Sequence, residues 1–423
     1  MNNWSSSVDT RFDSNSAPTS FRERIDIVDI LRGFALIGVI VANFQSMISW
    51  DYPSGTVDAA TVWFLENLVS GKFYRLFAFL FGLGFALQMA RLESRGVRFV
   101  PLYVRRLLIL GLIGIAHGIL FLPNDILALF AQFGLLLLLV RRVSNRSIAI
   151  IAIACLLAPH AYYYASTGFT DFRQAKPVAV QEQEAAERTK RREAREAETH
   201  RIRSEGTYRE VVDWNTSNFM RWHTNVQGQF AILSEEFLMF LLGLFAGRRR
   251  LFENLEKNGP YFRKVMWWSL LIGVAAHAIA PALYDLQSHP VHGHMATTAR
   301  LIVADIEPAA LALFYATAVT LLITRFKFGP RLKPVAALGR MALTNYLLLS
   351  IVVTTLFYNY GMGLYEEVTA LTGVALAIVA FALMMLTSSW WLGRFRFGPM
   401  EWAWRCLTYW KVQPLRLAKT ASA

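Results

Sequence analysis

Cysteine and charged residues are both scarce in this chain of 423 residues. It has only two cysteines, Cys155 within an apolar run and Cys406 near the C-terminus, and 17% of its residues are charged. Two cysteines so placed form neither a disulfide framework nor a zinc-ligand pattern, and we predict no metal cofactor. A charged fraction this low, beside 55% hydrophobic residues, is typical of a multi-span membrane protein and not of a soluble enzyme.

Motifs that would indicate a nucleotide-binding or hydrolase domain are missing as well. The chain contains no Gly-rich phosphate loop, no G-x-S-x-G elbow and no dinucleotide fingerprint. A cleavable signal peptide is not expected, because residues 1–28 are polar and the first apolar run is too long for an h-region. The net charge of +13 does not indicate a nucleic-acid partner, since the basic residues stand mainly in short segments between apolar runs.

Long apolar runs, in contrast, are abundant. Most of them reach the roughly 20 residues that cross the hydrocarbon core of a bilayer. We therefore predict an all-α integral membrane protein with about ten transmembrane helices, near 30–49, 73–91, 105–122, 126–140, 147–165, 230–247, 266–284, 306–324, 335–357 and 369–392. Lys and Arg gather in every second connecting segment, which predicts that the N- and C-termini are cytoplasmic.

These spans divide the chain into five parts. We expect a cytoplasmic tail at 1–29, five spans within 30–165, an extracytoplasmic charged loop at 166–229, five spans within 230–392 and a cytoplasmic amphipathic segment at 393–423. The charged loop carries acidic and basic residues four apart, such as Glu187 and Arg191, and this spacing favours a solvated helix.

The first apolar run opens with charged residues. In "IDIVDILRGFALIGVIVANF", residues 25–44, Asp29 and Arg32 stand at the entrance and Asn43 lies deep inside. The three side chains fall on one helical face, because Asn43 follows Arg32 by about three turns. A polar stripe of this kind faces protein or water, since ionisable groups in lipid cost several kcal/mol. Alternatively, Asp29 caps the helix and the Arg32 side chain extends to the membrane surface.

A second polar group lies in "GIAHGILFLPND", at the outer end of the third span. His117 is flanked by Gly114 and Gly118, which permit close helix approach, and Asp125 follows across a turn. A neutral His takes a proton from a hydroxyl or an amine, and a carboxylate fixes its tautomer, so both are candidate catalytic residues. Alternatively, His117 is hydrogen-bonded to a neighbouring helix and Asp125 caps the next span.

Further polar residues are expected at the same outer level of the membrane. Lys72 and Arg75 are exceptions to the charge distribution, and they are candidates for stabilising an oxyanion in the reaction of His117. The carboxylates expected to contribute to the same outer cavity are Glu235, Glu236, Asp305 and Glu307.

Two later segments carry candidate substrate-binding residues. Asn345 lies in the middle of the ninth span, where it lines a substrate passage or forms an interhelical hydrogen bond worth about 0.6 kcal/mol. Glu401 and Arg405, four residues apart after the last span, suit an ion pair on an interfacial helix. Their role is to admit the adenine or phosphates of a cytosolic ligand, or to close the structure on that side.

Five stretches of the sequence resemble the YeiB-like family of integral membrane proteins of unknown function. They occur in the expected order and reach from the first span to the C-terminal segment: "DILRGFALIGVIVAN", "GKFYRLFAFLFGLGFALQ", "YVRRLLILGLIGIAHGILFLPNDIL", "GRMALTNYLLLS" and "FGPMEWAWRCLTYW". The resemblance implies a multi-pass protein of the bacterial cytoplasmic (inner) membrane, with the lipid bilayer as its surroundings.

A wider resemblance concerns activity. Asp-x-x-Arg-Gly on the first span is similar to the start of the transmembrane acyltransferases, including the heparan-glucosaminide N-acetyltransferase and acyltransferase-3 groups. It implies that an acyl group moves from cytosolic acyl-CoA to a small-molecule, glycan or lipid acceptor on the far side. In the acyltransferase-3 branch a functional His occupies the position of Asn43, so another base is required here, and His117 is the candidate. The alternative is a transporter or lipid translocator whose buried polar residues form the substrate path.

Overall fold

Helices make up nearly all of the described chain. The computed structural model describes residues 26–48, 55–173, 178–225, 236–287 and 293–417, and in these ranges the only β-structure is an isolated bridge between Phe395 and Arg416. The predicted all-α class is confirmed. The helices are α1 Asp26–Gln45, α2 Thr56–Phe64, α3 Lys72–Ser94, α4 Phe99–Leu120, α5 Ile126–Val140, α6 Asn145–Arg173, α7 Val178–Ser204, α8 Tyr208–Thr224, α10 Leu238–Arg248, α11 Leu255–Leu286, α12 Gly293–Phe326, α13 Lys333–Arg340, α14 Ala342–Phe357, α15 Ala370–Leu392 and α16 Pro399–Tyr409.

Seven helical segments of the described chain are long and apolar enough to cross a membrane. They are Ile27–Gln45, Thr56–Ser94, Phe99–Leu120, Asn145–Ser166, Leu255–Leu286, Met295–Phe326 and Ala370–Leu392. The bent pair α13–α14 gives an eighth candidate, and α5 and α10 are shorter apolar helices. The chain is therefore a multi-pass membrane protein. The expected sixth span begins at 230, and its residues 230–235 lie outside the described ranges.

The expected ninth span is not one straight helix. A single span was predicted at 335–357, but α13 and α14 meet at Met341 with a bend of 71°. A side chain from elsewhere in the fold explains the break. The Glu401 carboxylate of α16 accepts hydrogen bonds from the backbone N–H groups of Leu343 and Thr344, at 2.7 and 3.1 Å. These are first-turn donors of α14 that a continuous helix would have used internally.

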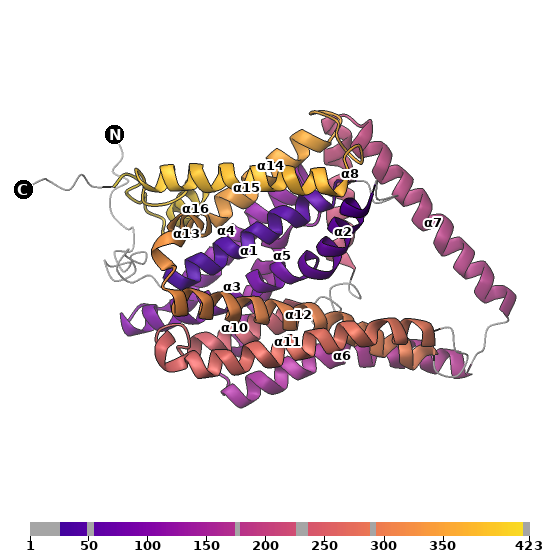
Figure 1. Cartoon of the computed structure of the whole chain (residues 1–423), viewed down its shortest axis with the longest axis horizontal. Helices are drawn as coiled ribbons and strands as arrows, with labels where there is room; N and C mark the ends of the chain where they lie inside the picture. Colours follow the sequence, from indigo (N-terminus) through magenta and orange to yellow (C-terminus); the bar gives the residue numbers. More distant parts are fainter. Residues whose placement is uncertain (1–25, 49–54, 174–177, 226–235, 288–292, 418–423) are drawn as a thin grey trace, which may run out of the picture.

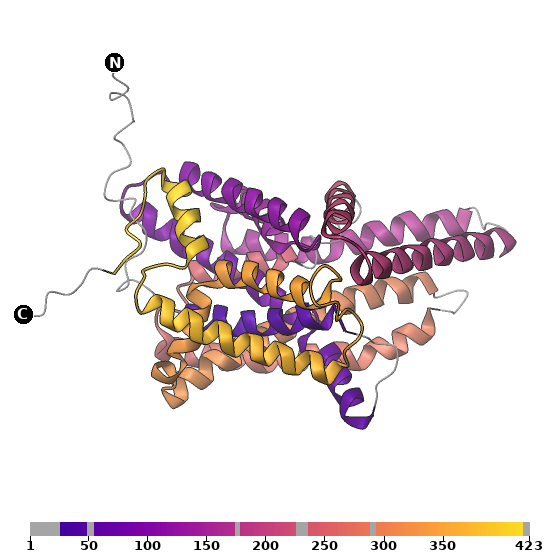
Figure 2. The ribbon, with the colours of Figure 1, turned by 90° about the horizontal axis from the view of Figure 1, so that it is seen from above.

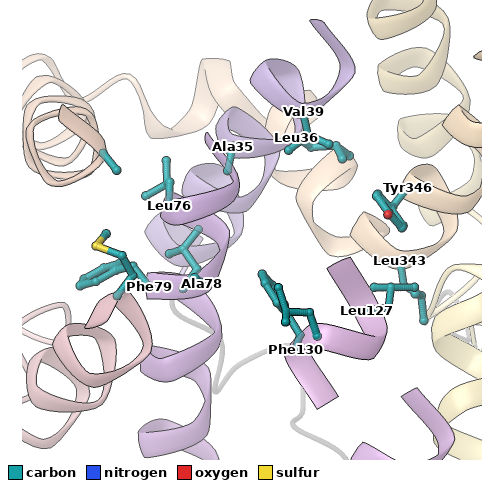
Figure 3. Packing of buried hydrophobic residues seen from close by; sticks show 14 of the residues in the cluster. Ala35, Leu36, Val39, Leu76, Ala78, Phe79, Leu127, Phe130, Leu343 and Tyr346 are labelled. Atoms are coloured by element: carbon teal, nitrogen blue, oxygen red, sulfur yellow. The ribbon is translucent and has the colours of Figure 1, made fainter. Parts of the chain in front are cut away.

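Helix α1 passes through the centre of the bundle and contacts α3, α13, α14 and α15. Its approach to α13 depends on glycine. A Cβ atom at Gly33 would lie 2.0 Å from the carbonyl oxygen of Val335, and one at Gly339 would lie 2.0 Å from that of Asp29. Small residues allow two helices to pack backbone against backbone in a membrane protein. Figure 3 shows the apolar core that gathers beside this contact, with labelled side chains of α1, α3, α5 and α14.

The two ends of the bundle differ. The beginning of α1 and the helix α16 lie at one end, which we call the terminal end, and α7 and α8 lie at the opposite end, the α8 end (Figure 1). α7 projects from the bundle and α8 packs on α4. Seen from above, α16 in yellow lies beside the helices of the terminal end (Figure 2). The loop predicted at 166–229 is mostly helical where it is described, with a break between α7 and α8, and its Glu187–Arg191 pair is present at 3.6 Å.

Candidate functional site

His117 lies near the end of α4 with a hydrogen-bond partner on each ring nitrogen. Its Nδ1 is 2.7 Å from Oδ1 of Asp125, and its Nε2 is 2.7 Å from Oγ of Ser350. All three side chains are buried, with His117 2% exposed and Ser350 not exposed at all. The predicted contact between His117 and Asp125 is therefore present in the structure.

Asp125 is held in place by the start of α5 and by α14. It is the N-cap of α5, where its Oδ2 accepts a hydrogen bond of 2.6 Å from the backbone N–H of Ala128. Its Oδ1 also accepts a hydrogen bond of 3.3 Å from the hydroxyl of Tyr346. The capping role and the contact with His117 were predicted as alternatives, but the two oxygens of one carboxylate serve both.

This network assigns the tautomer of His117. An ionised carboxylate only accepts hydrogen bonds, so the proton of a neutral imidazole sits on Nδ1, facing Asp125. Nε2 is then an acceptor for the Ser350 hydroxyl, 2.7 Å away, and the carbonyl oxygen of Tyr346, at 3.3 Å, is a second acceptor for the same hydroxyl. The order hydroxyl, imidazole and carboxylate is that of the serine hydrolase triad. Here, however, the hydroxyl comes from within a helix, α14, and not from a nucleophile elbow.

Tyr346 and Ser350 were not predicted as site residues. They are four residues apart on α14 and so share one helical face, which is turned towards α4. The ring centroids of His117 and Tyr346 are 4.9 Å apart. Tyr346 and Ser350 both lie within the stretch "GRMALTNYLLLS". Their spacing of four residues was the signal in the sequence that they share a helical face. Sequence alone does not show which face of a uniformly apolar helix meets His117.

Two glycines and α8 seal the site. A Cβ at Gly114 would lie 2.3 Å from the backbone nitrogen of Ala128, and one at Gly118 would lie 2.5 Å from the ring of Phe219. α8 is fastened to the end of α4, because the Asn215 amide donates to the carbonyl oxygen of Phe121 at 3.0 Å. These contacts keep bulk water away from His117.

Lys72 and Arg75 belong to a second cluster, which we call the ionic cluster. The Lys72 ammonium is 3.2 Å from Glu307, the Arg75 guanidinium is 3.9 Å from Asp305, and Asp305 is also 2.8 Å from Nε2 of His160. The cluster joins α3, α6 and α12, whereas His117 lies among α4, α5, α8 and α14. The expected single cavity is thus resolved into two groups of residues. His160 was not predicted as part of either group.

Of Glu235 and Glu236, the two glutamates expected in the same outer cavity, the structure describes one. Glu236 is buried in the helical turn that precedes α10, and Glu235 lies outside the described residues. Among the residues that the structure describes, no group of three or more His, Cys, Asp or Glu side chains is arranged to hold a metal ion.

The polar residues of the first span do not act as one stripe. Asp29 and Arg32 form the expected contact, with Nη1 of Arg32 2.9 Å from Oδ1 of Asp29. Asn43 instead donates a hydrogen bond of 2.8 Å to the carbonyl oxygen of Val39, within its own helix. This bond gives the amide a partner within its own helix.

The later candidates have structural partners. The Asn345 amide donates to Oγ of Ser388 on α15 at 2.9 Å and to the carbonyl oxygen of Leu338 at 3.2 Å, which is the interhelical alternative. Burial raises the pKa of the Glu401 carboxyl, while the hydrogen bonds that it accepts at the start of α14 oppose this shift. The guanidinium of Arg405 lies 4.6 Å from the ring centroid of Phe397.

Two family models match this chain in separate regions. The model described as a protein of unknown function, DUF418, matches residues 246–411. The model described as the catalytic part of heparan-alpha-glucosaminide N-acetyltransferase matches residues 24–185. His117 and Asp125 lie within the second match, and Ser350 lies within the first.

Bacterial relatives match over nearly the whole length. The uncharacterized protein YxaH of Bacillus subtilis is 32% identical, covering 95% of this chain and 98% of the relative. The uncharacterized protein YeiB of Escherichia coli is 28% identical, covering 91% of this chain and 96% of the relative. A 39.9 kDa protein encoded beside an amylase in Bacillus acidopullulyticus is also 28% identical, over 96% of this chain and 99% of the relative. No solved structure matches.

Proposed function

Because this chain belongs to the YeiB-like family, distantly related to the heparan-alpha-glucosaminide N-acetyltransferases, we propose that it is a membrane-embedded acyltransferase. The observation that carries the proposal is the two-sided hydrogen bonding of His117. Asp125 orients the imidazole from one side and leaves Nε2 facing a hydroxyl on the other. This is the arrangement of a general base that takes a proton from an oxygen or nitrogen nucleophile.

The proposed reaction uses Nε2 of His117 as the base. An acceptor hydroxyl or amine replaces the Ser350 hydroxyl at Nε2 and attacks the thioester carbon of the donor. The acceptor proton passes to Nε2 as the new bond forms, the carbon–sulfur bond breaks, and the thiolate leaves with that proton. Asp125 stabilises the imidazolium between these two steps, because its carboxylate already accepts the Nδ1 hydrogen.

The position of His117 favours transfer across the membrane. α4 runs from the terminal end to the α8 end, and His117 lies one turn before its last residue. An acceptor approaching from the α8 end meets His117 after displacement of α8, while a donor from the terminal end brings only its acyl arm along α4. With the terminal end in the cytoplasm, the donor is a cytosolic acyl-CoA.

Transfer and hydrolysis assays on the purified protein test this proposal. Wild-type protein in detergent should release free CoA from acyl-CoA, and His117→Ala should lose about 10²–10⁴-fold of that rate. His277→Ala is the matched control, because His277 is exposed on α11. If wild-type protein neither binds nor consumes any of a series of acyl-CoA donors, the acyltransferase proposal fails.

Cysteine labelling tests the orientation. Glu196→Cys in α7 should react with an impermeant thiol reagent added to intact cells, and Lys257→Cys at the start of α11 should not. The matched backgrounds lack Cys155 and Cys406, which are both free. Labelling of position 257 with protection of position 196 would place the donor entrance on the wrong side of the membrane.

The ionic cluster supports a second candidate function, a transporter. Lys72, Arg75, His160, Asp305 and Glu307 bring two cations, two carboxylates and an imidazole together inside a membrane protein. Buried ionisable groups of this kind mark proton relays and substrate paths. A transporter predicts gradient-driven uptake into proteoliposomes without CoA release, and uptake that Asp305→Asn abolishes.

A further inference from the structure

We propose that Arg32, Arg91 and Arg106 form a binding site for the phosphate groups of an anionic ligand at the terminal end of the bundle. We call this group the arginine site. It lies between α1, α3 and α4 and is bordered by α16. The inference rests on the proposed function where it identifies the ligand as the acyl donor, but the arginine site itself does not require that activity.

Arg106 is fixed in position by neutral groups. Its Nη1 donates a hydrogen bond of 3.1 Å to Oε1 of Gln88 on α3, and its guanidinium lies 4.1 Å from the ring centroid of Trp404 on α16. The indole of Trp404 in turn donates to the carbonyl oxygen of Arg106 at 2.9 Å. Among the described residues no carboxylate forms an ion pair with Arg106. The guanidinium is thus oriented while its charge stays uncompensated.

Two further arginines add charge of the same sign. The Arg32 guanidinium lies against α3, because a Cβ at Gly84 would be 3.3 Å from its Nη2. Gln88 follows Gly84 by one turn and Arg91 follows Gln88 by one more, so the three lie along one side of α3. Arg106 interacts electrostatically with both Arg32 and Arg91. Asp29 pairs with Arg32, whereas Arg106 has no carboxylate in ion-pair contact among the described residues.

Two buried hydrogen-bond donors near Arg106 have no partner among the residues that the structure describes. They are the hydroxyl of Tyr103, one turn before Arg106 on α4, and Nε2 of Gln88, whose oxygen holds Arg106. Buried polar groups in folded proteins nearly always have a partner, so two unpaired donors together indicate that a group is missing. Both are donors beside a cluster of positive charge. The missing group is therefore an acceptor with negative charge, and phosphate oxygens have both properties.

The arginine site is reachable and is aligned with His117. The Arg32 side chain is 34% exposed, so a ligand can approach from the terminal end. Arg106 and His117 are eleven residues apart on α4, which is about three turns on the same face and about 16 Å along the axis. A donor whose phosphates bind at Arg106 would therefore extend its acyl arm along α4 towards His117. An anionic phospholipid headgroup offers the same phosphate chemistry and is the other source of the ligand.

The test compares three probes on full-length protein: free coenzyme A, inorganic pyrophosphate, and nanodiscs with or without phosphatidylglycerol. Wild-type protein should bind coenzyme A and pyrophosphate, and Arg106→Gln should weaken both about tenfold or more, because charge-assisted bonds are lost. Arg394→Gln is the matched control, since Arg394 is exposed at the end of α15 and also stacks on an indole, at 4.5 Å from the ring of Trp390. Binding that is unchanged in Arg106→Gln, or lost equally in both variants, overturns the proposal.

Tyr103→Phe guards against a variant that merely misfolds. It removes a hydroxyl for which the described residues offer no partner, so the melting temperature should stay at or above that of wild type while ligand binding weakens. A melting temperature that rises with phosphatidylglycerol in wild type but not in Arg106→Gln, without coenzyme A binding, assigns the site to lipid. The two proposals fail separately. Acyl transfer with an unchanged KM in Arg106→Gln excludes the acyl donor as the ligand of the arginine site, whereas coenzyme A binding that depends on Arg106 without any transfer removes only the reaction.

Discussion

Ser350 and His117 are 233 residues apart in the sequence, yet Oγ of one lies 2.7 Å from Nε2 of the other. The bond joins α14, in the region that matches the family of unknown function, to α4, in the region that matches an acetyltransferase model. The site is therefore built from both halves of the chain. Neither matched region contains all of it.

Ser350→Ala distinguishes a hydrogen-bond partner from a nucleophile. If the acceptor replaces the Ser350 hydroxyl at Nε2, the variant should lose less than about tenfold in rate, against about 10²–10⁴-fold for His117→Ala. Rates of CoA release from both variants are the measurement. Equal losses, with a radiolabelled acyl group retained on wild-type protein, would show instead that Ser350 carries the acyl group.

Asp125→Asn separates the two roles of this side chain. Asn is as good an N-cap as Asp, so the stability of the variant should stay close to that of wild type. Its amide no longer stabilises the imidazolium, and the rate should fall. Asp125→Ala should lose the rate and about 1 kcal/mol of stability from the missing cap. Melting temperatures and CoA release, measured together, give both quantities, and a rate unchanged in Asp125→Asn would contradict the assigned tautomer.

Glu401→Ala should destabilise the protein through α14. The carboxylate accepts hydrogen bonds from Leu343, Thr344 and the Thr344 hydroxyl, so the variant leaves first-turn donors of α14 buried and unpaired. Each unpaired buried donor costs about 1–3 kcal/mol. The expected result is a clear fall in melting temperature in detergent. Glu256→Ala in the first turn of α11 is the control, because Glu256 is not buried.

The Lys72–Glu307 pair of the ionic cluster is suited to a double-mutant cycle. Lys72→Met removes the ammonium that pairs with the Glu307 carboxylate. Removing one partner of a buried ion pair lowers the stability by about 3–5 kcal/mol. Lys72→Met combined with Glu307→Gln should recover much of that loss. Denaturation of the four proteins in the same detergent measures the coupling. Strictly additive effects would mean that the two residues do not interact.

The sequence predicted local features well and long-range ones poorly. The helical class, the Asp29–Arg32 contact and the His117–Asp125 pair depend on residues close together in the chain, so periodicity and turn chemistry were sufficient. Ser350 and His160 were missed, because a single polar residue in an apolar helix does not reveal which helix it will meet. The bend at Met341 was missed because the Glu401 carboxylate, which caps the start of α14, stands about 60 residues later in the chain.

Helix α16 connects the two helices that carry the site. Through Glu401 it holds the beginning of α14, and through Trp404 and Thr408 it is bonded to Arg106 and Arg105 in the first half of α4. It therefore sets the axial register between α4 and α14, on which the 2.7 Å contact of His117 and Ser350 depends. Trp404 therefore has two functions in the fold, since its ring orients the guanidinium of the arginine site while its indole N–H holds the backbone of α4 in register with α14.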